Sequence, residues 1–320
     1  MRIFVTGATG FLGSRLVSAL KANGHSVLGL ARSADAEAGI RRLGAEAVPG
    51  DLDAPAALSL PPIDIVVHAA AHFRLAGPRA PYFQTNVVGT TALLAAARRA
   101  GASRFVHVSA GAVVMDDGGS PLRDVDESAA TFPDSFSAYI ASKSRGEAAV
   151  LAANADGFTT IALRPPGIWG PGDPFSKALP AMVGRGQFAF IGGGRYPYVT
   201  CHVDNVVEAV LCALERGQGG RAYFVNDSEP TTFRDFASGL AQALGLSVDR
   251  SPSIPYSLAF AVGRMMESAA AITRSKTDPP MSTSMVRLIG REFVTSDRRA
   301  REDLGYVGRR TRADGLRGYG

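Results

Sequence analysis

The chain has 320 residues, of which 46% are hydrophobic and 20% are charged, and it carries a net charge of +5. This is the composition of a globular protein, and it excludes disordered, fibrous and collagen-like chains. The modest positive charge suits an anionic small ligand. It does not indicate nucleic acid, because the arginines near the C-terminus alternate with acidic residues.

Short aliphatic segments alternate with segments of helical apolar spacing in the first half of the chain. Strands are predicted at 2–6, 26–31, 45–48, 63–68, 104–109 and 159–164, and helices at 12–22, 34–43, 85–100 and 138–154. The near-continuous aliphatic strands are typical of a parallel sheet that is covered on both faces. The predicted fold class is therefore α/β, a Rossmann domain with a doubly wound parallel sheet.

Beyond residue 165, loops rich in glycine and proline interrupt this alternation. A strand–helix pair is predicted over 200–215, a strand at 222–225, and helices at 233–244, 257–272, 283–289 and 298–304. We therefore expect a dinucleotide-binding domain at 1–165, to which 198–228 returns. A smaller, mainly helical substrate-binding domain is expected at 166–320.

The two cysteines, Cys201 and Cys212, have neither the number nor the spacing of a disulfide framework or a metal site. The chain begins with a predicted strand rather than a signal peptide, and the most apolar later segment is interrupted by Arg264 and Glu267. We expect a cytoplasmic protein with no metal, no nucleic-acid partner and no membrane span, and the sequence leaves a homodimer open.

A glycine-rich turn follows the first predicted strand, with Gly7, Gly10 and Gly13 at the spacing of a dinucleotide site. Gly7 permits a tight turn, Gly10 lets a pyrophosphate approach the backbone, and Gly13 allows the helix to pack closely on the strand. The N-terminus of the next helix offers N–H groups and a positive dipole to phosphates. Between a strand and a helix, the pattern predicts a dinucleotide site, and a glycine turn without a ligand is the alternative.

The end of the second predicted strand indicates which dinucleotide binds. An NAD site usually has an acidic residue there, which accepts from the ribose 2′-hydroxyl, but this chain has Arg32 and Ser33. A guanidinium can pair with a 2′-phosphate through two hydrogen bonds, and the serine hydroxyl adds a donor. The sequence therefore favours NADP over NAD. In the alternative, Arg32 is a surface residue and Asp35 caps the following helix.

Tyr139 and Lys143 lie four residues apart at the start of a predicted helix, and therefore on one face of it. A nearby ammonium lowers the pKa of a phenol, so that Tyr139 could exchange a proton with a substrate oxygen near neutral pH. The pair predicts an oxidoreductase that acts on an alcohol or ketone. The alternative is an ordinary amphipathic helix.

With these motifs, the chain resembles the extended short-chain dehydrogenase/reductase family, of the NAD(P)-dependent epimerase/dehydratase type, over essentially its whole length. The segments that carry the resemblance are TGATGFLG at 6–13, GDL at 50–52, HAAA at 68–71, TNVVGT at 85–90, the Tyr139–Lys143 pair, LRP at 163–165 and HVD at 202–204. With Arg32 and Ser33, the resemblance implies a cofactor site of Thr6, Gly7, Thr9, Gly10, Phe11, Leu12, Gly13, Asp51, Leu52, Ala69, Ala70, Ala71, Tyr139, Lys143, Pro165 and Ile168. It implies that Asp51 and Leu52 hold the adenine and that Lys143 binds the nicotinamide ribose.

Two positions qualify this resemblance. It makes Asn86 a supporting residue beneath the active site, while a buried amide that caps backbone groups is the alternative. The family usually has a serine or threonine after the fifth strand, which hydrogen-bonds the reacting oxygen. Aligned by its strand, that position falls on Ala110, and Ser109 stands one residue earlier. Either Ser109 serves as a catalytic residue instead, or another group polarises the substrate and Ser109 only ends the strand.

The C-terminal segments 278–283, 293–301 and 304–306 resemble the 3β-hydroxysteroid dehydrogenase-like branch of the family. Before them, apolar residues recur on one helix face, at Leu258, Val262, Met265, Met266, Ala269 and Ile272. Methionine pairs suit an adaptable pocket wall, and the alternative is that this face packs on the Rossmann domain. We expect a bulky, mainly apolar alcohol or ketone substrate, steroid-like or aromatic. A nucleotide-sugar epimerase or dehydratase and a non-catalytic NADP-binding protein are the alternatives.

Overall fold

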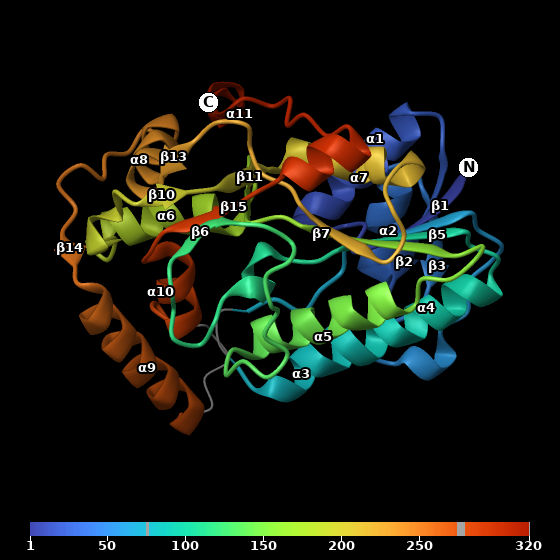
Figure 1. The fold of residues 1–320 in the computed structure, drawn as a ribbon, viewed down its shortest axis with the longest axis horizontal. Coiled ribbons are helices and arrows are strands. Elements are labelled where there is room, and N and C mark those ends of the chain that lie inside the picture. The colour runs from blue at the N-terminus through green and yellow to red at the C-terminus, as the bar shows by residue number, and fades with distance from the viewer. Residues whose placement is uncertain (75–76, 274–278, 320) are drawn as a thin grey trace.

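A seven-stranded parallel sheet forms the centre of the protein (Figure 1). The computed structural model describes residues 1–74, 77–273 and 279–319. The strand order is β12-β7-β5-β4-β1-β2-β3, which confirms the Rossmann fold class. The strands are β1 (Arg2–Thr6), β2 (Ser26–Ala31), β3 (Glu46–Pro49), β4 (Ile65–His68), β5 (Arg104–Val108), β7 (Thr159–Arg164) and β12 (Arg221–Phe224).

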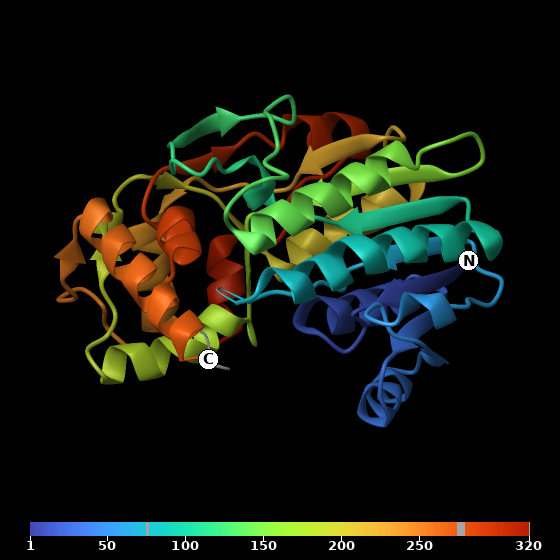
Figure 2. The same cartoon turned by 90° about the horizontal axis from the view of Figure 1, so that it is seen from below.

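Helices cover both faces of this sheet (Figures 1 and 2). One face carries α1 (Phe11–Ala22), α2 (Ala34–Arg42) and α7 (Val203–Glu215), and the other carries α4 (Thr90–Arg99) and α5 (Ala138–Ala152), preceded by α3 (Arg79–Phe83) and a π-helical turn, Gln84–Gly89. Successive side chains of a strand point to opposite faces of the sheet, and this decides which helices each side chain contacts. Phe105 packs in the core under α4 and α5, and its neighbour Val106 packs under α1 and α7.

A four-stranded sheet in the order β13-β10-β15-β6 lies beside the helices of the second half of the chain. Its strands are β6 (Leu122–Val125), β10 (Pro197–Tyr198), β13 (Thr231–Thr232) and β15 (Phe293–Thr295). Two further pairs join β8 (Gly167–Trp169) to β11 (Thr200–His202) and β9 (Phe190–Ile191) to β14 (Ser253–Ile254). Of these short strands the sequence predicted only β11, which begins the strand–helix pair at 200–215. It did not reveal the others, because segments of two to four residues show no periodicity.

The helices of the second half are α6 (Pro174–Gly184), α8 (Phe233–Ala243), α9 (Tyr256–Ile272), α10 (Thr283–Ile289) and α11 (Arg312–Arg317). Short 3-10 turns occur at Pro55–Ala57, Gly111–Val114 and Gly192–Gly194, and the helix predicted at 298–304 is a π-helical turn, Ala300–Leu304. Nowhere in the described ranges is a helix both long and apolar enough to span a membrane.

Asp227 joins the Rossmann sheet to the second half of the chain. Its carboxylate accepts four hydrogen bonds, each of 2.7 Å, from the Trp169 indole, the Thr200 hydroxyl, the His202 backbone and the Asn205 amide. A buried carboxylate is stable only when its oxygens are paired in this way. The cluster therefore fixes the position of β8 and β11 relative to the sheet.

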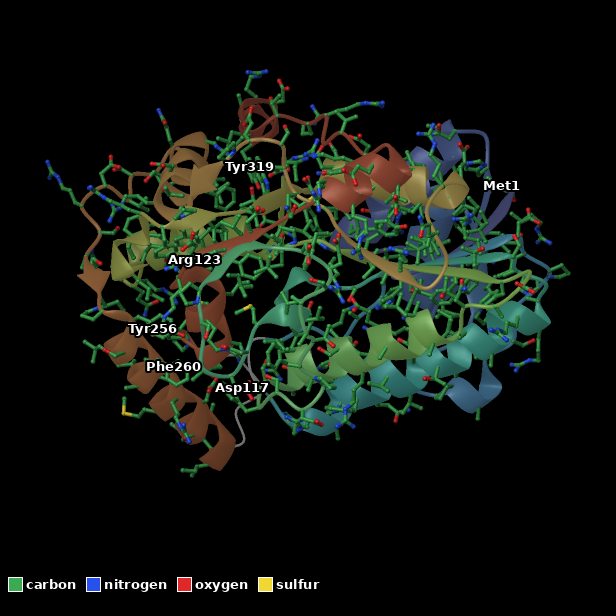
Figure 3. All side chains as sticks on the ribbon, in the orientation of Figure 1. Met1, Asp117, Arg123, Tyr256, Phe260 and Tyr319 are labelled. Carbon is green, nitrogen blue, oxygen red and sulfur yellow. The ribbon has the colours of Figure 1, made fainter. Side chains whose placement is uncertain are left out.

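Helix α9 lies at the end of the molecule opposite Met1, and Figure 3 labels Tyr256 and Phe260 on it. It packs on α10 through Ala259, Gly263 and Glu267, and the Glu267 carboxylate accepts from the Thr283 N–H at 2.9 Å. The alternative in which its apolar face packs on the Rossmann domain is wrong. Three side chains of that face are largely exposed: Leu258 by 52%, Met265 by 64% and Ile272 by 83%. Residue 278, within a segment that carried the resemblance, lies outside the described residues.

Candidate active site

The glycine-rich turn has the backbone geometry that its sequence predicts. Gly7 has φ +71°, and a Cβ at Gly13 would lie 1.8 Å from the Gly7 carbonyl oxygen, so that only glycine permits this contact between strand and helix. Helix α1 begins directly after Gly10, and no side chain caps its N-terminus. Its first N–H groups therefore fit a pyrophosphate, as the dinucleotide site requires.

Thr6 connects this turn to the end of β4. Its hydroxyl accepts from the Ala70 N–H at 3.1 Å and lies 2.7 Å from Nδ1 of His68. The other ring nitrogen of His68 lies 2.9 Å from the Thr90 hydroxyl, which itself donates to the Asn86 carbonyl at 2.8 Å. The Thr6 side chain thus holds the loop that begins with Ala69, and its hydrogen-bonding capacity is used inside the protein.

The residues at the end of β2 occupy the place expected for selection of the dinucleotide. The Ser33 hydroxyl caps α2 by accepting from the Ala36 N–H at 3.3 Å. The alternative in which Asp35 caps this helix is therefore wrong. Arg32 is exposed, and it forms no hydrogen bond or ion pair with any other part of the chain that the structure describes. Its guanidinium is available to an anion.

The remaining predicted cofactor residues lie after β3, β4 and β7, at the carboxyl ends of parallel strands. These ends share one edge of the sheet, which is where open α/β sheets bind ligands. Asp51 accepts from the Asp53 N–H at 3.0 Å, and the buried Leu52 packs against Gly89. The side chain of Leu12 is also buried, so it packs in the core. Along the same edge lie Thr9, Phe11, Ala69, Ala71, Pro165 and Ile168.

Tyr139 lies in the first turn of α5, where the Ser137 side chain caps the helix. Its ring packs edge-on against Phe73, with 4.9 Å between the ring centroids. Burial, and then Tyr82, raise the pKa of Tyr139. The expected lowering of this pKa by Lys143 is therefore wrong in this structure, because the loss of hydration outweighs the charge one turn away.

Lys143 is buried on the same face of α5, and its ammonium turns toward β5. Nζ donates to the Val108 carbonyl at 2.8 Å and lies 3.4 Å from Nε2 of His107. Burial lowers the pKa of Lys143 to about 8, although Glu147 opposes this shift. The side chain therefore carries its charge at neutral pH and can bind the hydroxyls of a ribose.

Asn86 is buried in the π-helical turn before α4. Its side chain accepts from the His72 N–H at 2.7 Å and donates to the His72 carbonyl at 3.1 Å and to the Ser142 hydroxyl at 3.0 Å. This is the geometry of the alternative, an amide that caps backbone groups. Because Ser142 lies between Tyr139 and Lys143 on α5, the contact also anchors that helix.

Ser109 follows β5 and is buried, and its hydroxyl has no hydrogen-bond partner among the described residues. Its N–H donates to the Leu163 carbonyl at 2.7 Å. Alternation from Phe105 through His107 places Ser109 on the α5 side of the sheet, which is the side of Lys143, and Ala110 on the opposite side. The hydroxyl is thus available on the side of the sheet that carries Lys143.

The sequence alone did not assign roles to His107, Ser142 and Phe73. For His107 a signal was present, because it precedes Ser109 by two residues on one strand and must share its face. Ser142 follows Tyr139 by three residues, which is also a contact spacing in a helix. Phe73 lies in a loop without periodicity, and only the structure shows its contact with Tyr139.

Comparison with known proteins agrees with this geometry. Residues 3–225 match the model of the NAD dependent epimerase/dehydratase family. A 4-hydroxy-2-methyl-3-oxo-4-farnesyl-3,4-dihydroquinoline-1-oxide ketoreductase of Stigmatella aurantiaca is 40% identical, over 99% of this chain and 95% of the relative. A 3 beta-hydroxysteroid dehydrogenase/Delta 5-->4-isomerase of Mycobacterium tuberculosis is 34% identical, over 76% of this chain and 70% of the relative.

Among solved structures, UDP-glucose 4-epimerase of Thermotoga maritima has a TM-score of 0.76 at 22% identity, over 100% of this chain and 97% of the other, and shares the fold. The sequence relatives confirm the expected class of enzyme, an NAD(P)-dependent oxidoreductase. The chain belongs to the NAD-dependent epimerase/dehydratase family.

Proposed function

We propose that this protein reduces a ketone on a bulky, mainly apolar substrate to a secondary alcohol, with NADPH as the cofactor. One observation carries the proposal: the phenol of Tyr139, which burial keeps protonated, packs edge-on against the half-exposed ring of Phe73. A proton donor therefore stands beside an apolar surface that a ligand can reach. The cytoplasmic location and the homodimer remain predictions.

In this mechanism the cofactor supplies the hydride, and the side chains of the chain handle the proton and the orientation. Tyr139 donates its proton to the oxygen of the reacting carbonyl, which a neutral phenol can do and a phenolate cannot. Lys143 binds the nicotinamide ribose with its ammonium. The unpartnered hydroxyl of Ser109 is the second hydrogen-bond donor to the carbonyl oxygen.

The preference for NADP over NAD rests on Arg32. Its guanidinium is exposed after β2, the strand that pairs with β1 and therefore lies beside the glycine-rich turn, and is free of protein partners within the described ranges. A 2′-phosphate would supply the missing anion and gain two hydrogen bonds. A ribose 2′-hydroxyl would leave the same guanidinium without an acceptor of comparable strength.

An apolar substrate fits the surroundings of Tyr139 better than a nucleotide sugar does. Phe73 and Phe136 are exposed by 52% and 48%. Phe73 contacts Tyr139 in the first turn of α5, and Phe136 directly precedes the residue that caps this helix. Three arginines of the second half of the chain are held by backbone oxygens: Arg234 donates to Gly193, Arg287 to Met115 and Arg291 to Gly119. The relative from Stigmatella aurantiaca is named as the ketoreductase of a farnesyl-bearing 3-oxo-dihydroquinoline.

The experiment is to incubate the purified protein with NADPH and a panel of ketones and to follow NADPH oxidation. The panel contains a 3-ketosteroid, a prenylated aromatic ketone and a small polar ketone, and a parallel reaction contains UDP-glucose with NAD. Oxidation of NADPH with the two bulky apolar ketones supports the proposal. Isomerisation of the sugar, with no reduction of any ketone, overturns it.

A further inference from the structure

We propose that His107, as a neutral imidazole with its proton on Nδ1, positions Lys143 by accepting a hydrogen bond from the lysine ammonium at Nε2. This inference rests on the proposed function, since it concerns the lysine that binds the cofactor ribose. His107 belongs to β5 and is paired in register with His68 on β4. Both rings face α4 and α5, with 5.0 Å between their centroids.

The partners of Lys143 define the geometry. An ammonium has three donors and no acceptor, and two of the three are directed to the Val108 carbonyl at 2.8 Å and to Nε2 of His107 at 3.4 Å. No other partner of Nζ occurs in the described parts of the chain. Because two of the N–H donors are bound to acceptors on β5, the direction of the third N–H is determined. This third donor is available to the cofactor.

The protonation state of His107 follows from the same contact. Because the ammonium can only donate, Nε2 must accept, so the neutral ring carries its proton on Nδ1. Burial, then Lys143 and His68, hold the pKa of His107 well below its usual range. Nδ1 itself is buried and has no partner among the residues that the structure describes. An unpaired N–H in a core costs free energy of folding. The contact of Nε2 with Lys143 offsets this cost and explains why a histidine occupies the position.

His68 has the opposite tautomer, and its own contacts determine this. The Thr90 hydroxyl donates its proton to the Asn86 carbonyl, so it can only accept from His68 Nε2–H. Nδ1 of His68 then accepts from the Thr6 hydroxyl. Burial, then Lys143, lower the pKa of His68 to about 3. His68 therefore stays neutral behind His107 and adds no positive charge that would repel Lys143.

The other charged groups near the pair lie on α5 and β7. Glu147, one turn beyond Lys143 on α5, favours the charged lysine. Its carboxylate is held by Arg164 of β7 at 2.6 Å, so its position does not depend on His107. A change at position 107 should therefore alter the pKa of Lys143 through the lost acceptor and leave the other neighbours of the lysine in place.

Nitrogen NMR of the histidine rings tests the tautomers in the unmodified protein. The protein has five histidines, and the signals of His107 are assigned by their loss in His107→Gln. We expect a neutral Nδ1–H ring for His107 and a neutral Nε2–H ring for His68. A His107 ring that is protonated on Nε2, or charged at neutral pH, overturns the proposal.

A matched pair of variants tests the positioning. In His107→Gln the side-chain oxygen can reach the place of Nε2, whereas in His107→Asn the same amide is one methylene too short. NADPH affinity is measured as a function of pH by fluorescence, which needs no turnover, and thermal unfolding checks that both variants fold. We expect the NADPH affinity of His107→Gln to be close to that of the wild type. For His107→Asn we expect an affinity about tenfold weaker, and a loss of binding at high pH that begins about one pH unit lower.

The outcomes separate this proposal from the proposed function. If Gln and Asn behave alike, or if both match the wild type, His107 does not position Lys143, whatever the enzyme reduces. If the NMR and binding results are as expected but no ketone is reduced, the positioning stands and the proposed function fails. If only one of the two variants folds, that variant supplies the assignment of the His107 signals, and the tautomers measured in the wild type decide.

Discussion

Glu147 and Arg164 form a buried ion pair that ties helix α5, which carries Tyr139 and Lys143, to the end of β7. The carboxylate accepts from Nε of the guanidinium at 3.1 and 3.0 Å and from Nη2 at 2.6 Å, and the two side chains are only 2% and 4% exposed. Because both charged groups are buried away from water, each is stabilised by the opposite charge of the other. The pair lies one turn beyond Lys143, so it fixes the helix that carries the proposed proton donor.

Loss of this carboxylate should destabilise the whole domain. We expect Glu147→Gln to lower the free energy of unfolding by about 3–5 kcal/mol, because it leaves a buried guanidinium without its counter-charge. Urea denaturation measures this. Glu37→Gln is the matched control, since Glu37 pairs with Arg41 at 2.6 Å on the exposed surface of α2, and such pairs contribute about 0.3–0.5 kcal/mol. Equal losses in the two variants would contradict the account.

Arg32 should determine the choice of cofactor. We expect the wild type to bind NADPH more tightly than NADH, and Arg32→Ala to remove most of this preference, about 1.5–3 kcal/mol for a lost charge-assisted contact. Titration of both cofactors against both proteins measures it. Arg99→Ala, at the exposed end of α4, is the control for a general loss of positive charge. Equal affinity of the wild type for the two cofactors would refute the NADP assignment.

Ser109 should act on the substrate and not on the cofactor. We expect Ser109→Ala to reduce kcat by about 10²-fold, as for loss of one donor to a developing oxyanion, with unchanged affinity for NADPH. Ser144→Ala is the control, because Ser144 is also buried and its hydroxyl has no partner in the described part of the chain. If kcat is unaffected in Ser109→Ala, the serine only ends the strand and another group polarises the carbonyl.

The rate of ketone reduction should fall at high pH. Burial lowers the pKa of Lys143 to about 8, and a lysine is charged below its pKa and neutral above it. We therefore expect kcat/KM to be constant below about pH 8 and to decrease above it, as the ammonium that binds the ribose is lost. Steady-state kinetics from pH 6 to 10 measure this, about two units either side of that pKa. A rate that rises through pH 8 would contradict the assignment.

The Rossmann domain and its glycine-rich turn could be predicted because local chemistry determines them. Long aliphatic strands and amphipathic helices leave a clear periodicity, and only glycine permits the contact between Gly13 and the Gly7 carbonyl. The small second sheet could not be predicted, since its short strands form through tertiary pairing. The exposed face of α9 was also unpredictable, because periodicity shows that a face exists and does not show what covers it.

The places of the candidate site residues in the fold were predictable, and their protonation and contacts were less so. The spacing of Tyr139 and Lys143 correctly places both on one side of α5. The direction of the Tyr139 pKa shift was wrong, because burial cannot be seen in a spacing. The partner of Lys143 on β5 was missed for a related reason. His107 has no motif of its own, and its role arises only when two elements meet.

The kinetics of Tyr139→Phe test the central claim most directly. The change removes only the hydroxyl that donates the proton, so we expect kcat for ketone reduction to fall by about 10²–10⁴-fold while the Kd for NADPH stays at its wild-type value. Tyr256→Phe is the matched control, because the Tyr256 hydroxyl has no partner among the described residues and lies on α9; it should retain full activity. A Tyr139→Phe protein that reduces the ketone within a few-fold of the wild-type rate would contradict the account.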